Sequence, residues 1–516
     1  MKNILHLLLV LVTLLHFSAC RKKVEGCDEC PIVKSLSPDK GLPGDTINIV
    51  GKNFSDDLLQ NKVRFNEMLV PEAYMIRSNI NQITVRVPEN CGTGPVSVST
   101  GNNLDSGPGA VFTYEYGRIT GLIPAQGKKG DTVFIKGVSF STTKNIVKFN
   151  DVLANVFYES DTLIKAVVPS NCGSGTVSIA LPNTLILKSA MDFTYIYTYT
   201  SSTYIGIPKT EGFQNGPFLT ATFKDLHAFV YDARSRSIYI ADGNCIRRCN
   251  NGQVSTWAGV QGTAGYKDGY GTAALLDNPW KLAVNSVGDL YIPDQNNFCI
   301  RKITASNGLV TTFCGKAKQA GDLDGKGTAA LFGLPYAIDI LQDSIYFISD
   351  VGNKKLRRVD SKTNVKTLPL STTYNAMQIF VLDKNTLLGL DVTNNQLLKI
   401  DLLTSVITVY AGAGTAGSAD GDMLMATFHT PTSIAMRMVN GKREIYIADT
   451  DNNLIRRITY DNKVSTVMGD AAGYADGVNR TALFDHPNGL AFDATNTNIL
   501  YVLDAGNKVI RKVVID

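Results

Sequence analysis

Six strand endings of one type limit the folds that this chain can adopt more than any other feature of its sequence. Each is a short apolar run that stops at an aspartate, as in "SIYIAD", "DLYIPD" and "EIYIAD". These aspartates are Asp242, Asp294, Asp350, Asp391, Asp449 and Asp504, at steps of 52, 56, 41, 58 and 55 residues. A polar turn and a second apolar strand such as "LIRRI" follow each of them. Repeats of this length, built from several short strands, predict a six-bladed β-propeller over residues 199–516.

The two ends of this array predict how the ring closes. The last repeat ends at "VIRKVVID" on its third strand, whereas residues 201–206, "SSTYIG", have the pattern of a fourth strand. We expect this N-terminal strand to complete the last blade. Such closure removes free sheet edges, which are a liability in an exposed β-protein.

Two copies of a different pattern precede the array, over residues 31–115 and 116–198. One contains "SLSPDKGLPGDTINIVGKNF" and ends on "VFTYEY", and the other contains "GLIPAQGKKGDTVFIKGVSF" and ends on "DFTYIY". Short alternating strands separated by glycine, proline and asparagine turns predict two immunoglobulin-like β-sandwich domains. The predicted fold class is therefore all-β.

Both patterns resemble known families. The Pro-x-x-Gly-x-x-Gly-Asp start, the later Gly-x-x-Phe and the Val-Pro before a glycine turn resemble the IPT/TIG family of immunoglobulin-like domains. The Tyr-Ile-Ala-Asp strand end, the asparagine turn and the Ile-Arg-Arg-Ile strand resemble the NHL-repeat family of β-propellers. The first resemblance implies spacer or binding modules, which we interpret as a stalk. The second implies an NHL-type propeller.

The N-terminus has the pattern of an export signal. In residues 1–19, Lys2 precedes an apolar run that ends on Ser-Ala before Cys20, which predicts a secretory signal peptide. "FSAC" resembles the bacterial lipoprotein box, which implies that Cys20 is lipidated and that residues 20–30 form a linker to the membrane. We expect an outer-membrane lipoprotein, on the cell surface or on the periplasmic face.

The cysteines leave two pairings open. An oxidising compartment permits disulfides, and the sequence does not decide whether Cys27 pairs with Cys30 or Cys91 with Cys172. Cys27 and Cys30 form a Cys-x-x-Cys without a second pair or a nearby histidine, so we do not expect zinc there.

A sixteen-residue connecting segment recurs before the first strand of most blades, as in "GYKDGYGTAALLDNPW" (265–280) and "GDLDGKGTAALFGLPY" (321–336). Its absence between the third and fourth blades accounts for the short step of 41 residues. The Gly-x-x-Asp-Gly start is typical of a tight turn. Calcium would need about six to eight oxygens, whereas each segment supplies one such carboxylate: Asp268, Asp324, Asp420 and Asp476. We therefore interpret these aspartates as structural and expect no metal.

The last residue of the connecting segment differs from blade to blade. It is His227, Trp280, Tyr336, Thr432 and Asn488 in chain order. Inner strands of a propeller begin at the mouth of the central channel, on the face that carries the turns after the second strands, where Asn297 lies. Aromatic rings beside amides suit a sugar, which stacks its C–H face and bonds its hydroxyls. The candidate ligand-binding residues are therefore Trp280, Tyr336, His227, Asn488 and Asn297; core packing of the aromatics and turn formation by the asparagines are the alternatives.

Paired basic residues, such as Arg301-Lys302 and Arg456-Arg457, occur on the third strand of most blades. Neighbours on a strand point to opposite faces, so one of each pair can brace the aspartate of its blade. Because the net charge is only +4 and the chain carries an export signal, we expect no nucleic-acid partner.

No catalytic motif is present in the sequence. Its histidines outside the signal, His227, His429 and His486, belong to different blades, and inner-strand carboxylates are scattered at Asp232, Asp339 and Asp493. We therefore expect no enzyme activity and no cofactor. The chain is interpreted as a lipoprotein that binds a polysaccharide or oligosaccharide. The alternatives are a protein-binding scaffold or adhesin with an outer-membrane protein partner, and a metal-dependent hydrolase or lyase of the propeller type.

Overall fold

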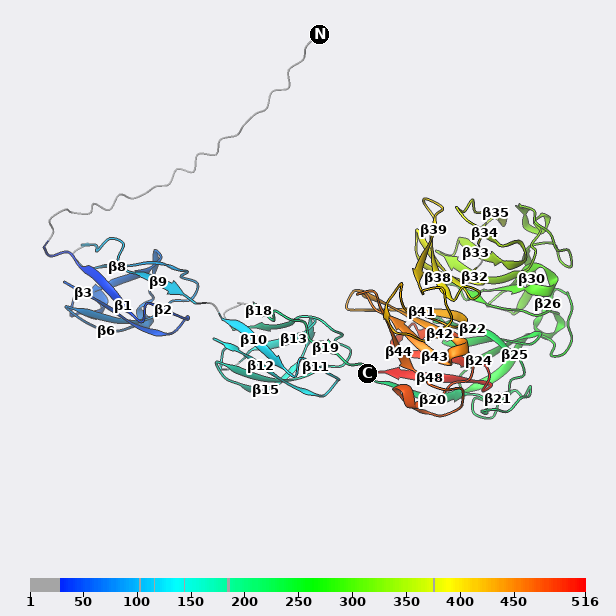
Figure 1. Ribbon diagram of the computed structural model, residues 1–516, viewed down its shortest axis with the longest axis horizontal. Helices are drawn as coiled ribbons and strands as arrows, with labels where there is room; N and C mark the ends of the chain where they lie inside the picture. Colours follow the sequence, from blue (N-terminus) through cyan, green and yellow to red (C-terminus); the bar gives the residue numbers. More distant parts are fainter. Residues whose placement is uncertain (1–27, 102–103, 116, 143, 183–185, 375) are drawn as a thin grey trace, which may run out of the picture. The chain divides into compact units, whose positions relative to one another are not determined.

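The computed structural model describes residues 28–101, 104–115, 117–142, 144–182, 186–374 and 376–516. The predicted signal peptide and Cys20 lie outside these ranges. The described chain is built from β-strands and short 3-10 turns (Figure 1), which confirms the all-β prediction. No helix in these ranges is long and apolar enough to cross a membrane. The described residues divide into two compact units: those within 28–125, 132–167 and 176–193, and those within 126–131, 168–175 and 194–516.

The first sandwich has two sheets. One has the order β1 (Ile32–Ser37), β3 (Thr46–Lys52), β7 (Gln82–Arg86), β6 (Met75–Asn79). The other has the order β2 (Lys40–Gly41), β9 (Val111–Tyr114), β8 (Gly94–Ser99), β4 (Lys62–Phe65), β5 (Met68–Leu69). Alternate residues of these strands form one buried core, in which the Phe65 and Phe112 rings meet edge to face with centroids 5.2 Å apart.

The second sandwich repeats this plan. Its sheets have the orders β10 (Arg118–Ile123), β12 (Thr132–Val138), β16 (Leu163–Val167), β15 (Asn155–Glu159) and β14 (Val152–Leu153), β13 (Ile146–Phe149), β17 (Val177–Ala180), β18 (Ile186–Lys188). Phe149 and Phe193 make the equivalent edge-to-face contact, with centroids 4.9 Å apart. The short parallel pair β11 (Gln126–Gly127) and β19 (Thr194–Tyr195) belongs to the second unit.

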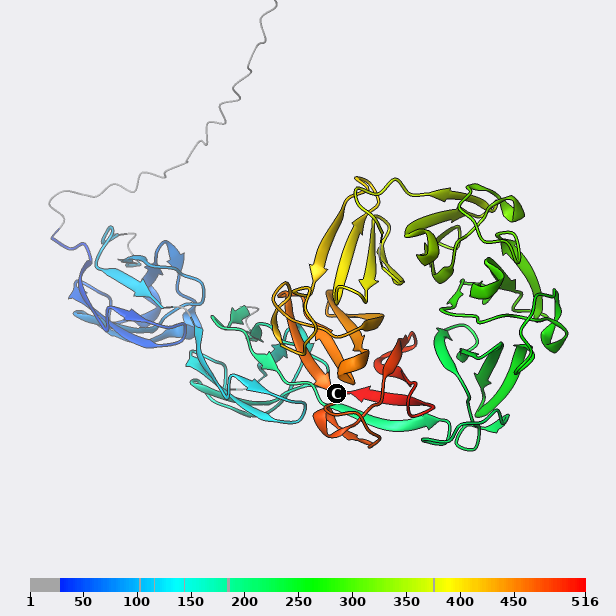
Figure 2. The ribbon, with the colours of Figure 1, turned by 45° about the vertical axis from the view of Figure 1, so that its right-hand side comes forward.

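The described residues between 199 and 516 form six sheets arranged as a ring (Figure 2). The first blade contains β21 (Gly216–Pro217), β22 (Leu226–Asp232), β23 (Ser237–Asp242), β24 (Cys245–Asn250) and β25 (Gln253–Gly259). The second contains β26 (Gly269–Tyr270), β27 (Ala283–Val284), β28 (Leu290–Asp294), β29 (Cys299–Ile303) and β30 (Leu309–Cys314). The third contains β31 (Gly325–Lys326), β32 (Pro335–Leu341), β33 (Ile345–Asp350), β34 (Lys355–Asp360) and β35 (Asn364–Thr367).

The other three sheets include the fourth blade, which lacks a short first strand. The fourth blade contains β36 (Gln378–Asp383), β37 (Thr386–Asp391), β38 (Gln396–Asp401) and β39 (Ile407–Ala411). The fifth contains β40 (Gly421–Asp422), β41 (Pro431–Val439), β42 (Lys442–Asp449), β43 (Leu454–Ile458) and β44 (Lys463–Met468). The sixth contains β45 (Gly477–Val478), β46 (Pro487–Asp493), β47 (Asn496–Asp504) and β48 (Val509–Ile515). The missing strand is the one that the absent connecting segment would have supplied.

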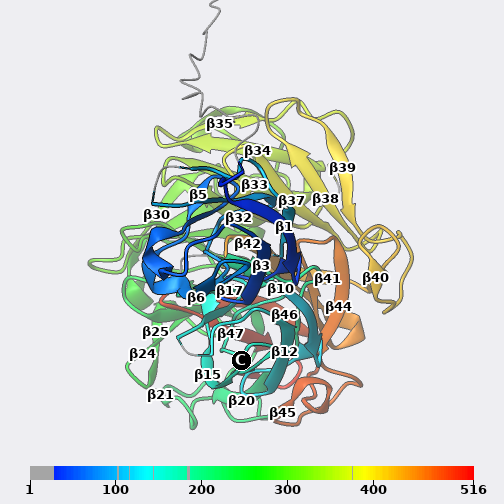
Figure 3. The same ribbon diagram turned by 90° about the vertical axis from the view of Figure 1, so that its left-hand side faces the viewer.

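The sixth sheet is completed from the other end of the array. Strand β20 (Tyr199–Ile205) pairs antiparallel with β48, and β45 pairs with its other edge. Figure 3 shows β20 and β45 side by side. The predicted closure by an N-terminal strand is confirmed.

The cysteine pairings are partly resolved. Cys30 is disulfide-bonded, and Cys27 lies outside the described residues. Cys91 and Cys172 occupy equivalent buried positions in the two sandwich repeats and are not joined to each other. Burial raises the pKa of the Cys91 thiol to about 11 and that of Cys172 to about 12.

Candidate functional site

A buried arginine braces five of the six described sheets. In the second blade Arg301 Nη1 lies 3.0 Å from Asp294 Oδ2, and its Nη2 lies 2.6 Å from Asp268 Oδ1. The same pattern joins Arg357 to Asp350 and Asp324, Arg456 to Asp449 and Asp420, and Arg511 to Asp504 and Asp476. In the first blade Arg247 pairs with Asp242 and with the amide oxygen of Asn215. The predicted brace is confirmed, and the connecting-segment aspartates are its second partners.

The brace also employs one of the candidate ligand-binding residues, Asn297. This side chain is 1% exposed, and its Nδ2 donates to Asp294 Oδ2 and to Gly265 O, both at 2.8 Å. Burial raises the pKa of Asp294 to about 6, against the opposing effect of the Asp277 backbone N–H and Arg301. Asn297 is therefore corrected to a structural residue, because its amide hydrogens are already committed inside the blade.

Three of the candidate aromatic residues form a continuous stack. The His227 and Trp280 rings are nearly parallel, at 8°, with centroids 4.7 Å apart, and the Trp280 and Tyr336 rings lie 4.4 Å apart at 29°. They come from the starts of the inner strands of three successive blades, and all three are half-buried. Both faces of Trp280 are thus covered by its neighbours, so this indole presents its edge rather than a face.

His227 is fixed at one end of the stack. Its Nδ1 lies 2.9 Å from Pro279 O and its Nε2 lies 3.1 Å from Asp225 Oδ2. One contact is to a backbone carbonyl and the other to a carboxylate, and together they fix the plane of the imidazole against the indole of Trp280.

Two polar atoms beside the stack have no hydrogen-bond partner among the described residues. They are Trp280 Nε1 and Asn488 Oδ1, and both are buried. The amide nitrogen of Asn488 lies 3.3 Å from His227 O and 3.4 Å from Leu226 O, which attaches the sixth blade to the first. Buried polar atoms without partners are rare because they cost free energy, so the stack would gain if a ligand or water reached this donor and this acceptor.

The strand register completes the ring of mouth positions. In the third blade Tyr336 lies between the pairs Pro335–Asp350 and Ala337–Ser349. In the fourth blade Gln378 pairs with Leu390, so Met377 is the equivalent of Tyr336. Sequence comparison missed Met377 because the fourth blade has no connecting segment; counting back from its strand-ending aspartate would have found it.

Lys281, just before β27, and Asp339, on β32, place two opposite charges close in sequence to the stack. Asp339 accepts hydrogen bonds from the backbone N–H of Val381 at 2.7 Å and of Ile340 at 2.9 Å. Burial raises the pKa of Asp339, while those two N–H groups oppose it. Burial lowers the pKa of Lys281, and the charge of Asp339 opposes that shift. The sequence pattern does not single out Lys281, although it directly follows Trp280.

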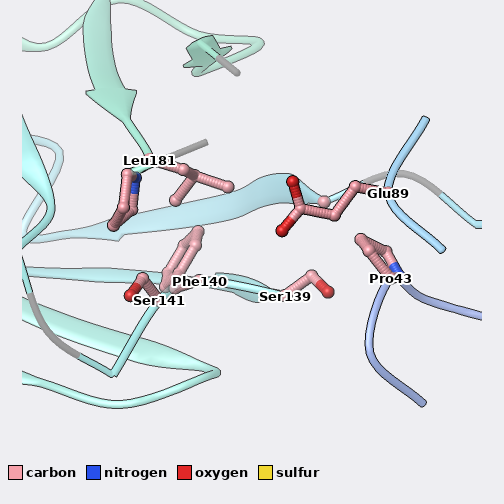
Figure 4. Close-up of a pocket in the computed structure, with 8 residues that line it drawn as sticks. Pro43, Glu89, Ser139, Phe140, Ser141 and Leu181 are labelled. Atoms are coloured by element: carbon pink, nitrogen blue, oxygen red, sulfur yellow. The ribbon is translucent and has the colours of Figure 1, made fainter. Parts of the chain in front are cut away.

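Two hollows lie elsewhere. One of about 560 Å³ on the propeller is lined by residues 353–356 and 367–374, where the connecting segment is absent. The other, of about 210 Å³ in the first unit, is lined by residues that include Glu89, Phe140 and Leu181 (Figure 4). In the described ranges, no group of three or more His, Cys, Asp or Glu side chains could hold a metal ion. The aromatic stack remains the strongest candidate site.

Residues 31–116 and 118–195 match the model of the IPT/TIG domain, which confirms both sandwich assignments. Among relatives, Protein SUPPRESSOR OF QUENCHING 1, chloroplastic, of Arabidopsis thaliana is 27% identical over 285 residues, which are 49% of this chain and 27% of that protein. The human NHL repeat-containing protein 2 is 24% identical over 276 residues, which are 51% of this chain and 34% of that protein. The chain thus spans about a third or less of these relatives, and the resemblance to NHL-repeat proteins is confirmed.

Solved structures share the fold. A Bacteroides thetaiotaomicron protein of unknown function matches with a TM-score of 0.53 and 18% identity, over 78% of this chain and 98% of that one. A protein of the same organism described as an auxiliary nutrient binding protein matches with a TM-score of 0.50 and 16% identity, over 78% and 98% of the two chains. At these identities the likeness concerns the fold alone.

Proposed function

We propose that this chain is a non-catalytic, membrane-anchored extracytoplasmic lipoprotein whose propeller binds a carbohydrate. The site is the mouth cluster, which we define as His227, Trp280, Tyr336 and Asn488. The single observation that carries the proposal is the pair of unpartnered polar atoms, Trp280 Nε1 and Asn488 Oδ1, beside the aromatic stack.

The stack changes how a sugar would bind. Because His227 and Tyr336 cover both faces of Trp280, the indole contributes its edge, and its Nε1–H donates to a hydroxyl. Asn488 Oδ1 accepts from another hydroxyl. Tyr336, at the end of the stack, supplies apolar surface for the C–H groups of the ring. One donor, one acceptor and one apolar surface match what a sugar presents.

Two further observations support this proposal. The structural relative described as an auxiliary nutrient binding protein has the same fold over 98% of its length, and carbohydrates are one class of nutrient. The signal pattern and Cys20 would attach the chain to a membrane, where glycan capture from the surroundings takes place. An outer-membrane protein partner is compatible with the same anchoring.

The test is calorimetry or affinity electrophoresis of the chain against a panel of polysaccharides and oligosaccharides. We expect Trp280→Ala and Asn488→Ala to weaken binding of the glycan that the wild type prefers. The matched control is Trp257→Ala, because Trp257 packs on the Arg248 guanidinium, 4.8 Å from its ring centroid, rather than in the cluster. Absence of any glycan binding, or equal losses in Trp280→Ala and Trp257→Ala, would count against the proposal. A co-purified protein that survives loss of the aromatics would favour the scaffold alternative.

A further inference from the structure

The outer face of the sheet β10–β12–β16–β15 carries a row of exposed apolar side chains. The register pairs Ile123 with Phe134, Phe134 with Lys165, and Lys165 with Tyr158. Ile123 is 49% exposed, Phe134 38% and Tyr158 46%. Four strands thus contribute one continuous line of side chains, which we name the aromatic row.

A lysine is held in the middle of the aromatic row. Lys165 Nζ lies 5.5 Å from the Phe134 ring centroid and 4.8 Å from that of Tyr158. Both rings stabilise the ammonium in this place, and no hydrogen bond to another described residue occupies its N–H groups, which can therefore bind an anion. The adjacent row adds Lys136, which is exposed and pairs with Leu163.

The residues around the aromatic row leave its charge positive. The two flanking rows are Gly121, Lys136 and Leu163 on one side and Thr132, Val167 and Asn155 on the other. None of these described positions is a carboxylate. Within these three rows an acidic ligand therefore meets two cations and no carboxylate.

The first sandwich provides an internal comparison. Its equivalent row is Ser37, Asn48, Thr84 and Arg77. Three of these side chains bond to one another: Thr84 Oγ1 donates to Asn48 Oδ1 at 2.7 Å, and Arg77 Nε donates to Thr84 Oγ1 at 3.1 Å. Since the same fold forms with a polar row, the aromatic row of the second sandwich is not required for folding.

We propose that the aromatic row is a second glycan-binding surface of this chain, for polysaccharides that carry carboxylate or sulfate groups. The Phe134 and Tyr158 strands are two strand spacings apart, about 9–10 Å, so an extended sugar chain can contact both rings. The rings contact C–H faces, and Lys165 pairs with an acidic group of the same chain. This inference rests on the proposed function, since it extends glycan binding from the mouth cluster to the stalk.

The experiment compares the full chain and its variants by affinity electrophoresis in polygalacturonate, which is acidic, and in dextran, which is neutral. The row variant carries Phe134→Asn and Lys165→Thr, the residues of the first sandwich. We expect it to lose about tenfold or more of its affinity for polygalacturonate. The matched control is Leu153→Asn, which removes an apolar side chain that is 64% exposed on the other sheet of the same sandwich; we expect no change.

The outcomes separate the two proposals. A row variant that binds polygalacturonate as tightly as the wild type overturns the aromatic-row proposal, and so does a wild type that binds only neutral glycans. If Trp280→Ala changes no glycan affinity while the row variant loses the acidic polymer, the mouth-cluster proposal fails and the aromatic row stands. Binding of a protein through the row, without polysaccharide binding, also overturns the inference. Lys165→Gln alone, which leaves both rings in place, should lose binding to the acidic polymer and its salt dependence.

Discussion

Replacing Arg301 with leucine removes the cation that lies between two carboxylates of the second blade. Arg301 Nη1 is 3.0 Å from Asp294 and Nη2 is 2.6 Å from Asp268, and the side chains of Arg301 and Asp294 are both 0% exposed. Asp268 is 48% exposed and can turn to water, whereas Asp294 cannot. Loss of one partner from a buried ion pair costs about 3–5 kcal/mol. We expect the free energy of unfolding of the propeller to fall by that amount at neutral pH.

The loss should depend on pH in a defined direction. Burial already raises the pKa of Asp294 to about 6, and Arg301 is among the groups that hold it down, so the variant should have a still higher pKa there. A carboxyl whose pKa is higher in the folded state than in the unfolded state binds a proton on folding. Its contribution to stability falls as pH rises from the unfolded pKa to the folded pKa. The interval extends further upward in the variant. The difference between the two proteins should therefore be smaller near about pH 5 and grow above about pH 6, by at most about 1.4 kcal/mol for each pH unit.

Urea unfolding followed by tryptophan fluorescence measures this difference. Both tryptophans of the chain, Trp257 and Trp280, lie in the propeller, so the signal reports that unit rather than the sandwiches. Lys302→Leu is the matched control, because its ion pair with Asp289 is partly exposed and should contribute about 1 kcal/mol or less. Equal losses in the two variants, or a loss that is constant from pH 5 to pH 8, would refute the reasoning.

Three further predictions address closure, the candidate site and the anchor. Ser201→Pro should lower propeller stability by about 3 kcal/mol or more in the same urea assay, because Ser201 is 2% exposed and β20 pairs on both sides there; wild-type stability would mean that the ring does not depend on this strand. Asn488→Ala should weaken glycan binding about tenfold and cost no more than about 1 kcal/mol of stability, because its amide contacts to His227 O and Leu226 O are long, at 3.3 and 3.4 Å. Asn297→Ala should cost about 1–3 kcal/mol of stability and leave affinity unchanged. Calorimetry measures the affinities and urea unfolding the stabilities, and a reversed pattern would contradict the site assignment. Cys20→Ser should move the protein from the membrane to the soluble fraction, as followed by fractionation and immunoblot, and continued membrane attachment would contradict lipidation at that residue.

The braces could be predicted from the sequence because they depend only on strand periodicity. Arg301 and Lys302 are neighbours on β29, so they point to opposite faces, and only one of them can reach Asp294. Closure by β20 was predictable for a similar reason, since the missing fourth strand and the unplaced "SSTYIG" segment matched. The brace repeats in five of the six described sheets, so several copies support the same prediction.

The geometry of the mouth cluster could not be predicted in the same way. The sequence indicates that His227, Trp280 and Tyr336 lie at equivalent positions, but ring orientation depends on rotamers and on how successive blades are spaced. Sequence analysis consequently treated Trp280 as a platform, whereas its two faces are covered. Asn297 was misassigned for a related reason. The sequence of a turn does not show whether its asparagine amide faces solvent or, as here, the aspartate of its own blade.

The fourth blade indicates that the arginine and the connecting segment depend on each other. Its strand ends at Asp391, seven residues before Leu398, which is 9% exposed and takes the place of the arginine. In the second, third, fifth and sixth blades the second guanidinium nitrogen binds an aspartate of the connecting segment, and no such segment precedes the fourth. A buried arginine there would have one carboxylate instead of two and would leave donors unpaired, which is costly. Asp391 is instead bonded by the backbone N–H and side-chain amide of Asn394, at 3.0 and 2.8 Å. Loss of the connecting segment therefore accounts for loss of the arginine, while the turn that holds the aspartate is retained.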